Sequence, residues 1–228
     1  MLQKKDSSAL QGDVHILIQA RMGSRRLPGK SLLPFGKSTV VGYLYNSLIQ
    51  HGFSSESISF VIPDSSDNDI LSDYLSDNKI SFFRGAEKDV PSRYIEASKH
   101  VPQETIVRLT ADNPLISTTL IEYCIKHHLK SKANVTSTRL IDEDGNIIRY
   151  APKGSSVDIF NKDILGSIDI ESCSSFEREH VIPAIFKNTE VNAVKENQLT
   201  RFGVNLKRQE IISIDTQQDY LEALKCLK

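Results

Sequence analysis

Apolar runs alternate with segments of helical periodicity throughout the first half of the chain, and this alternation constrains the fold more than any other feature. The run VHILIQA (14–20) predicts a buried strand, and TVVGYLYNSLIQHG (39–52) has apolar residues at helical spacing with Gly52 as a C-terminal cap. The same order recurs in the strands SISFVIP (57–63), KISFFRG (79–85) and TIVRLT (105–110) and in the helices DILSDYLSD (69–77), SRYIEASKH (92–100) and one through Tyr123 and Ile125. Such an alternation predicts right-handed βαβ crossovers and an α/β fold with a mostly parallel sheet.

The middle of the chain changes character. NVTSTRLIDEDGNIIRYAP (134–152) carries an Asp144-Gly145 turn between two β-prone runs, which predicts a small β-hairpin insertion. The pattern then predicts strand-like residues in SSVDIF (155–160), a helix through FEREHVIPAIFKN (176–188), strands at VNAVKE (191–196) and IISI (211–214), and a closing helix through DTQQDYLEALKCL (215–227). The sequence shows no internal repeat or low-complexity linker, so we expect one domain at 13–228. The polar residues 1–12 before it are expected to form a flexible tail.

Composition limits which kinds of ligand and which cellular compartments are expected. The 28 Lys and Arg residues nearly balance 29 Asp and Glu, so the chain lacks the basic field that holds nucleic acid, and a small-molecule ligand is favoured. Cys124, Cys173 and Cys226 are widely spaced and suggest neither a zinc site nor a disulfide framework, which favours a reducing compartment. The first dozen residues are polar and the sequence has no apolar stretch of membrane-spanning length. We therefore expect a cytoplasmic protein without a membrane partner.

A basic, glycine-containing loop follows the first strand. In QARMGSRRLPGKS (19–31), five residues separate Gly23 from the Gly29-Lys30 pair, whereas a P-loop requires four. Pro34 would also break the helix that a P-loop opens, and the second Gly-Lys-Ser, at 36–38, lacks the required Gly at position 31. Ligands of open α/β sheets lie beyond the carboxyl ends of strands, so this loop predicts phosphate binding, although solvated surface charge is the alternative. Its cations are Arg21, Arg25, Arg26 and Lys30.

Two aspartates follow apolar runs at matching positions. Asp112 comes after IVRLT, and Asp215 comes after IISI. Both are expected at the same edge of the sheet as the basic loop, where two carboxylates and nucleotide phosphates would supply the oxygen ligands that Mg²⁺ takes. In the alternative, Asp215 belongs with the helix cap that Thr216 and Asp219 can form, and Asp112 sets an Asp-x-Pro turn.

Several stretches carry a resemblance to a known family. IQARMGSRRLPGKSLLPFG, RGAEKDVPSRYIEA, VRLTADNPLI, and EREHVIPAIF followed by SIDTQQDY resemble the spore-coat polysaccharide biosynthesis cytidylyltransferases and, more distantly, the enzymes that make CMP-KDO and CMP-sialic acid. The likeness spans nearly the whole chain after the tail. It implies a Rossmann-like nucleotidyltransferase fold, CTP and a sugar as substrates, release of pyrophosphate with Mg²⁺, a homodimer often built through the hairpin, and a role in surface polysaccharide or glycoconjugate synthesis.

The resemblance also implies roles for individual residues. It assigns nucleotide binding to Arg21, Gly23, Ser24, Arg26, Lys30, Arg84, Asp89, Arg93 and Arg108; sugar binding to Asp158, Glu177, Arg178, Glu179 and His180; catalysis to Lys30, Arg21 and Asp112; and metal binding to Asp112 and Asp215. Asp89 and Arg93 alternatively form an ordinary i, i+4 helix pair, and the cluster at 177–180 a solvated helical face. Ser156 stands where relatives often have Asp, which leaves the identity of the acceptor open.

The inferred reaction is attack by a sugar hydroxyl on the α-phosphorus of CTP, which requires positioning and charge neutralisation more than covalent catalysis. A glycosyltransferase that consumes a nucleotide sugar is one alternative, but ADNP lacks the second Asp of an Asp-x-Asp metal motif. A catalytically silent nucleotide-binding relative is another, and it predicts damaged phosphate and metal positions, whereas both sets are present here.

Overall fold

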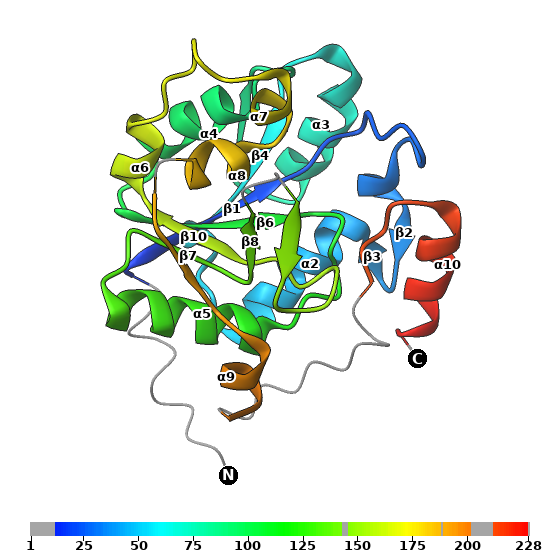
Figure 1. Cartoon of the computed structure of the whole chain (residues 1–228). Coiled ribbons are helices and arrows are strands. Elements are labelled where there is room, and N and C mark those ends of the chain that lie inside the picture. The colour runs from blue at the N-terminus through cyan, green and yellow to red at the C-terminus, as the bar shows by residue number, and fades with distance from the viewer. Residues whose placement is uncertain (1–11, 143–145, 188, 202–211, 228) are drawn as a thin grey trace.

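The computed structural model describes residues 12–142, 146–187, 189–201 and 212–227, and a seven-stranded sheet forms its centre (Figure 1). The strand order is β11-β7-β10-β6-β1-β4-β5. The strands are β1 (Val14–Gln19), β4 (Ile58–Pro63), β5 (Phe82–Gly85), β6 (Thr105–Thr110), β7 (Val135–Ser137), β10 (Asp158–Asn161) and β11 (Val191–Ala193). β10 runs antiparallel to β6 and β7, and the other pairs are parallel, which confirms the mostly parallel α/β sheet.

Helices cover both faces of the sheet because successive side chains of a buried strand point to opposite faces. Ile16 and Ile18 of β1 pack in the cluster that holds the apolar sides of α2, α3 and α5, whereas Leu17 packs in the cluster of α4, α6 and α8. Figure 1 shows α2 and α5 on one side of the sheet and α4, α6 and α8 on the other. The bounds are α2 (Val40–His51), α3 (Asp69–Asp77), α4 (Val90–Lys99), α5 (Thr118–Ser131), α6 (Lys162–Gly166), α7 (Ser175–Glu179), α8 (Val181–Phe186), α9 (Glu196–Arg201) and α10 (Gln217–Lys225). Gly52 caps α2 at φ 112°, as expected.

The basic loop does not open into an α-helix. Lys30 begins a single 3-10 turn, η1 (Lys30–Leu32), and the chain continues into the two-stranded hairpin of β2 (Pro34–Phe35) and β3 (Ser38–Thr39). The other 3-10 turns are η2 (Ser55–Ser57) and η3 (Ser66–Asn68). This path agrees with the rejection of a P-loop.

The inserted hairpin is present as β8 (Arg139–Ile141) paired antiparallel with β9 (Ile147–Arg149), whereas the Asp144-Gly145 turn lies outside the described residues. The tail at 1–11 and Ile211 of the last expected strand also lie outside them. Residues 212–214 are described and do not form a strand. No helix among the residues that the structure describes has both the length and the apolar character needed to cross a membrane.

The helix expected through 176–188 was wrong in one respect, because the chain bends at His180 and separates α7 from α8. His180 has the extended angles φ −131° and ψ 98°. Pro183 lacks an N–H donor and is tolerated only in the first turn of a helix. A new helix beginning at Val181 satisfies this requirement, and the bend directs His180 toward the carboxyl edge of the sheet.

Candidate functional site

A cavity of about 360 Å³ opens at the carboxyl edge of β1 and β6. The ends of these strands form its floor, because the parallel register aligns Gln19 with Thr110. The basic loop, the end of α7 and Asp215, which precedes the N-cap residue of α10, form its walls. Its lining residues are Gln19, Ala20, Arg21, Ser24, Arg25, Arg26, Lys30, Ser31, Arg108, Thr110, Ala111, Asp112, Glu179, His180 and Asp215.

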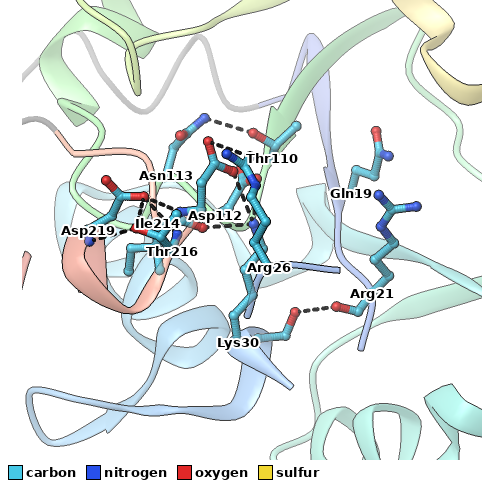
Figure 2. Close-up of polar contacts among 12 residues, drawn as sticks. Gln19, Arg21, Arg26, Lys30, Thr110, Asp112, Asn113, Ile214, Thr216 and Asp219 are labelled. Atoms are coloured by element: carbon cyan, nitrogen blue, oxygen red, sulfur yellow. Dashed lines mark hydrogen bonds and ion pairs between the residues drawn. The ribbon is translucent and has the colours of Figure 1, made fainter. Parts of the chain in front are cut away.

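Lys30 lies between the two predicted metal ligands, Asp112 and Asp215, and Figure 2 shows its side chain directed at Asp112. Its Nζ is 3.0 Å from Oδ2 of Asp112 and 3.6 Å from Oδ1 of Asp215, and it donates a hydrogen bond of 2.8 Å to the carbonyl oxygen of Ile214. The side chain of Lys30 is only 12% exposed. The structure thus gathers around one ammonium group residues that lie 82 and 185 positions further along the chain.

Local packing explains how this arrangement forms. Gly29 adopts the left-handed φ of 73°, which a glycine accepts without strain, and this turns the chain so that Lys30 enters the cavity. Phe35 beside the basic loop packs with Ile214 and Ala223 in a separate apolar cluster. The backbone N–H of Ile214 also donates a hydrogen bond of 2.8 Å to the backbone carbonyl oxygen of Asp112. Figure 1 shows α10 beside the β2–β3 hairpin, and this packing delivers Asp215 to the cavity.

The helix cap near Asp215 is real, but the carboxylate of Asp215 is not part of it. Thr216 is the N-cap of α10 and forms a reciprocal capping box with Asp219. The carboxylate of Asp215 instead pairs through Oδ2 with Arg26 at 3.3 Å and Lys153 at 2.8 Å. Partial burial alone would raise the pKa of Asp215, but the hydrogen bond from Lys153 and the charges of Lys153, Lys30 and Arg26 hold this pKa below its usual value. Asp215 is therefore anionic at neutral pH.

The donor set fits Mg²⁺. Two carboxylates close to one cation supply the hard oxygen ligands that Mg²⁺ accepts, and nucleotide phosphates and water commonly complete its coordination. Across the described ranges, no group of three or more His, Cys, Asp or Glu side chains is arranged to hold a metal. A two-carboxylate site that depends on phosphate oxygens is consistent with that finding.

A buried ion-pair cluster supports one wall of the cavity. Asp158, expected to bind the sugar, is fully buried and accepts from Nη1 of Arg108 at 3.0 Å, from Nη2 of Arg139 at 2.7 Å and from Oγ of Ser137 at 2.7 Å. Arg108 lines the cavity and donates from Nη2 to Oε1 of Gln19 at 2.9 Å. Burial alone would raise the pKa of Asp158, but Arg139 and Arg108 hold it below its usual value. Asp158 thus does not line the cavity itself, and its influence on the cavity is through the position of Arg108.

The second predicted nucleotide motif lies outside the cavity lining. Arg84 pairs with Asp69 at 2.7 Å and also donates to two backbone carbonyls. Asp89 caps α4 by accepting from the N–H of Ser92 at 3.0 Å, and it pairs with Arg178 rather than with Arg93. Arg93 is 2% exposed, and its Nε and Nη1 have no hydrogen-bond partner among the described residues. The nucleotide-binding roles of these residues stay predictions.

The charged cluster at 177–180 divides into two pairs. Glu177 completes the capping box of α7 and pairs with Lys187 at 3.0 Å, and Arg178 pairs with Asp89. Glu179 and His180 line the cavity. Burial, with further repulsion from Arg108, Arg21 and Arg139, lowers the pKa of His180 against the opposing effect of Glu179. The imidazole is therefore neutral at pH 7, and this pair is the better placed to meet a substrate.

The basic loop contributes most of its predicted residues to the cavity. Arg21, Ser24, Arg26 and Lys30 line it, and so does Arg25, which was one of the cations of the loop but received no role from the family resemblance. A Cβ added to Gly23 would meet open space in the described part of the chain, so the glycine is not required there by packing. Lys153 was also missed, because the segment that follows the hairpin carries no motif that connects Lys153 to Asp215.

Comparisons with known proteins agree on the family. A family model described as "Cytidylyltransferase" matches residues 15–228. The uncharacterized protein MJ1063 of Methanocaldococcus jannaschii is 34% identical over 213 residues, 92% of this chain and 82% of that protein. The spore coat polysaccharide biosynthesis protein SpsF of Bacillus subtilis is 29% identical over 227 residues, 94% of this chain and 86% of that protein.

Solved structures agree as well. A cytidylyltransferase from Leptospira borgpetersenii superposes with a TM-score of 0.76 at 29% identity and covers 91% of this chain and 83% of that one. A CMP:2-keto-3-deoxy-manno-octonic acid synthetase solved with CTP superposes with a TM-score of 0.62 at 16% identity, covering 93% and 98% of the two chains. The second likeness supports the fold alone, and together they confirm the expected nucleotidyltransferase architecture.

Proposed function

The chain belongs to the cytidylyltransferase family and is a nucleotidyltransferase, and from this premise we propose that it transfers CMP from CTP to a sugar and releases pyrophosphate. The observation that carries the proposal is the position of Lys30 between Asp112 and Asp215, in a cavity that the arginines of the same basic loop also line. This arrangement offers cations for a triphosphate and two carboxylates for a divalent ion within one small volume. A sugar acid or a related glycan precursor is the proposed acceptor.

In the proposed reaction, a hydroxyl oxygen of the sugar forms a bond to the α-phosphorus while the bond from that phosphorus to the bridging oxygen of pyrophosphate breaks in line. The proton of the hydroxyl passes to water. Arg21, Arg26 and Lys30 neutralise the charge that accumulates on the departing pyrophosphate. Asp112 and Asp215 would hold Mg²⁺, which when bound polarises phosphoryl oxygens and lowers the pKa of a nearby hydroxyl.

The other end of the cavity is proposed to receive the sugar. Glu179 and neutral His180 line it and can accept and donate hydrogen bonds to hydroxyl groups. Arg108, held in place by buried Asp158, presents a guanidinium group beside them. Polar groups of this kind fix the orientation of a bound sugar, which is what in-line attack requires.

We further propose a homodimer that acts in the cytoplasm in surface polysaccharide or glycoconjugate synthesis. The exposed side chains of Ile147 and Ile148 on β9, 41% and 40% exposed, support the hairpin as the interface between two copies. Similarity to the spore coat polysaccharide biosynthesis protein SpsF supports the proposed pathway, and the sequence composition, with three widely spaced cysteines, supports the proposed compartment.

A pyrophosphate-release screen tests the proposed function. CTP, UTP, ATP and GTP are each combined with a panel of sugar acids and amino sugars in the presence of Mg²⁺. We expect release only with CTP and one class of sugar, with no release when the sugar is omitted. A glycosyltransferase would instead consume a nucleotide sugar and release a nucleotide. A chain that binds CTP but turns over no sugar in a broad panel would indicate the silent relative.

Lys30→Ala is expected to weaken CTP binding by about 10- to 100-fold, the range that corresponds to one lost hydrogen bond from a charged group. Calorimetric titration of CTP measures the change, and circular dichroism checks that the fold persists. Lys37→Ala is the matched control, because Lys37 is an exposed lysine on the neighbouring β2–β3 hairpin. Equal CTP affinity in the Lys30→Ala variant and the parent would contradict the phosphate role of the basic loop.

A further inference from the structure

A tight turn between β9 and β10 holds Lys153 at its tip. The N–H of Ser155 donates to the carbonyl of Pro152 at 3.0 Å, and Gly154 has φ 96°, as at the third position of a type II turn. Ser155 is fully buried, and its carbonyl accepts from Oγ1 of Thr138 at 3.1 Å. The base of the turn is therefore fixed to the sheet, and the direction in which Lys153 leaves it is set by backbone geometry.

Lys153 reaches from this turn to the carboxylate of Asp215. Its Nζ lies 2.8 Å from Oδ2, the oxygen that Arg26 also approaches at 3.3 Å. The other oxygen, Oδ1, is the one that faces Lys30 inside the cavity. The two oxygens of Asp215 therefore have different surroundings, because Oδ2 is held from outside and Oδ1 is presented to the site.

The exposed fractions of Lys153 and Asp215 indicate that their ion pair orients the carboxylate rather than stabilises the fold. The side chain of Lys153 is 61% exposed, and that of Asp215 is 18% exposed. Ion pairs between two exposed groups contribute little to stability. Here the carboxylate of Asp215 is mostly buried, and the ion pair opposes a rotation of the carboxylate that would exchange its two oxygens. Two cations approach Oδ2. Arg26 is 64% exposed and belongs to the basic loop, whereas Lys153 is held by a turn whose base is fixed by hydrogen bonds.

We propose that Lys153 is a positioning residue for Asp215, and that its hydrogen bond to Oδ2 keeps Oδ1 directed at the divalent cation that CTP brings into the cavity. This inference rests on the proposed function, because it requires Asp215 to be a metal ligand. Outer hydrogen bonds of this kind orient ligating carboxylates, and their loss typically weakens metal affinity or activity 10- to 100-fold. It also makes the turn between β9 and β10 part of the proposed metal site.

The test compares CTP affinity with and without the metal. Calorimetry gives the dissociation constant for CTP in saturating Mg²⁺ and again in EDTA, and the ratio of the two is the tightening due to Mg²⁺. In Lys153→Met we expect this tightening to fall about tenfold, while the affinity in EDTA is unchanged because Lys153 is not among the residues that line the cavity. Lys153→Arg should keep the tightening, because its guanidinium group still donates to Oδ2.

Two further variants separate the possible failures. Lys126→Met removes an exposed lysine from a 2.7 Å pair with Glu122 away from the cavity, so it should change neither constant. Asp215→Asn should abolish the tightening if the proposed metal pair is correct. An Asp215→Asn variant that keeps the tightening overturns the metal pair and the positioning role with it. If the tightening due to Mg²⁺ is lost in Asp215→Asn but kept in Lys153→Met, the positioning role alone is overturned. If Lys153→Met lowers CTP affinity as much in EDTA as in Mg²⁺, Lys153 instead contacts a phosphate directly, and the positioning role is overturned.

Discussion

Asp112→Asn and Asp215→Asn are each expected to lower turnover by about a hundredfold or more, the scale of a lost electrostatic group in an active site. The double variant is expected to be hardly slower than either single variant. Both carboxylates lie within 3.6 Å of the same ammonium group, so in the proposed complex they hold one divalent ion together. Once the first ligand is lost the second has little left to hold, which makes the two losses grossly non-additive.

The measurement is the steady-state rate of pyrophosphate release, taken over a Mg²⁺ titration for the parent, the two single variants and the double variant. Excess Mg²⁺ should rescue a single variant in part and the double variant hardly at all. Glu222→Gln is the matched control, since Glu222 is an exposed acidic residue of α10 whose carboxylate accepts a hydrogen bond from Gln218 and does not contact Asp215. It should leave turnover unchanged and alter stability by at most about 0.5 kcal/mol.

A contrary result has a specific meaning. If Asp215→Asn keeps full turnover and only lowers the melting temperature, then Asp215 serves to tie Lys153 and Arg26 to the start of α10. The metal site would then consist of Asp112 and the phosphates of the nucleotide. Additive losses in the double variant would instead place the two carboxylates on separate functions.

The sequence was enough to predict that the basic loop and Asp112 meet at the carboxyl edge of the sheet. Apolar runs followed by polar residues predicted β1 and β6, and parallel strands place their carboxyl ends together, so the meeting of the basic loop with Asp112 did not depend on detailed packing. Asp215 is different, because residues 212–214 do not form a strand. It reaches the same edge through the packing of Ile214 and α10 on the β2–β3 hairpin, which strand periodicity does not encode.

Other features were hidden because they depend on contacts across long stretches of chain. The stretch GSSVDIF indicates a carboxylate at Asp158, but not that the antiparallel register of β10 sets it opposite Arg108 on one side and Ser137 on the other. Likewise, Lys153 is an unremarked lysine until the Pro152–Ser155 turn and the start of α10 are placed side by side. Sequence patterns report local structure and strand ends, whereas ion-pair partners require the assembled fold.

The buried position of Asp158 leads to the second large expected effect, which is on stability. Asp158→Asn should lower the free energy of unfolding by about 3–5 kcal/mol, because it leaves the guanidinium groups of Arg108 and Arg139 enclosed without a counter-charge. Urea denaturation at neutral pH measures this loss. Asp69→Asn is the matched control, since it breaks a pair with Arg84 in which the aspartate is 57% exposed, and it should change stability by at most about 1 kcal/mol.

The dependence on pH gives an independent check of the same ion pairs. The pKa of Asp158 is lower in the folded protein than in the unfolded chain, so its carboxylate contributes stability that is present above the unfolded value of about 3.9 and is lost as the pH falls through the folded value. The difference in stability between the parent and Asp158→Asn should therefore be full at neutral pH and shrink only in acid below about pH 4. If the variant is instead as stable as the parent and only its KM for the sugar rises, Asp158 contacts the sugar directly, as the family resemblance implied. A loss of stability accompanied by weaker sugar binding would mean that Asp158 acts through Arg108, the member of the buried cluster that lines the cavity.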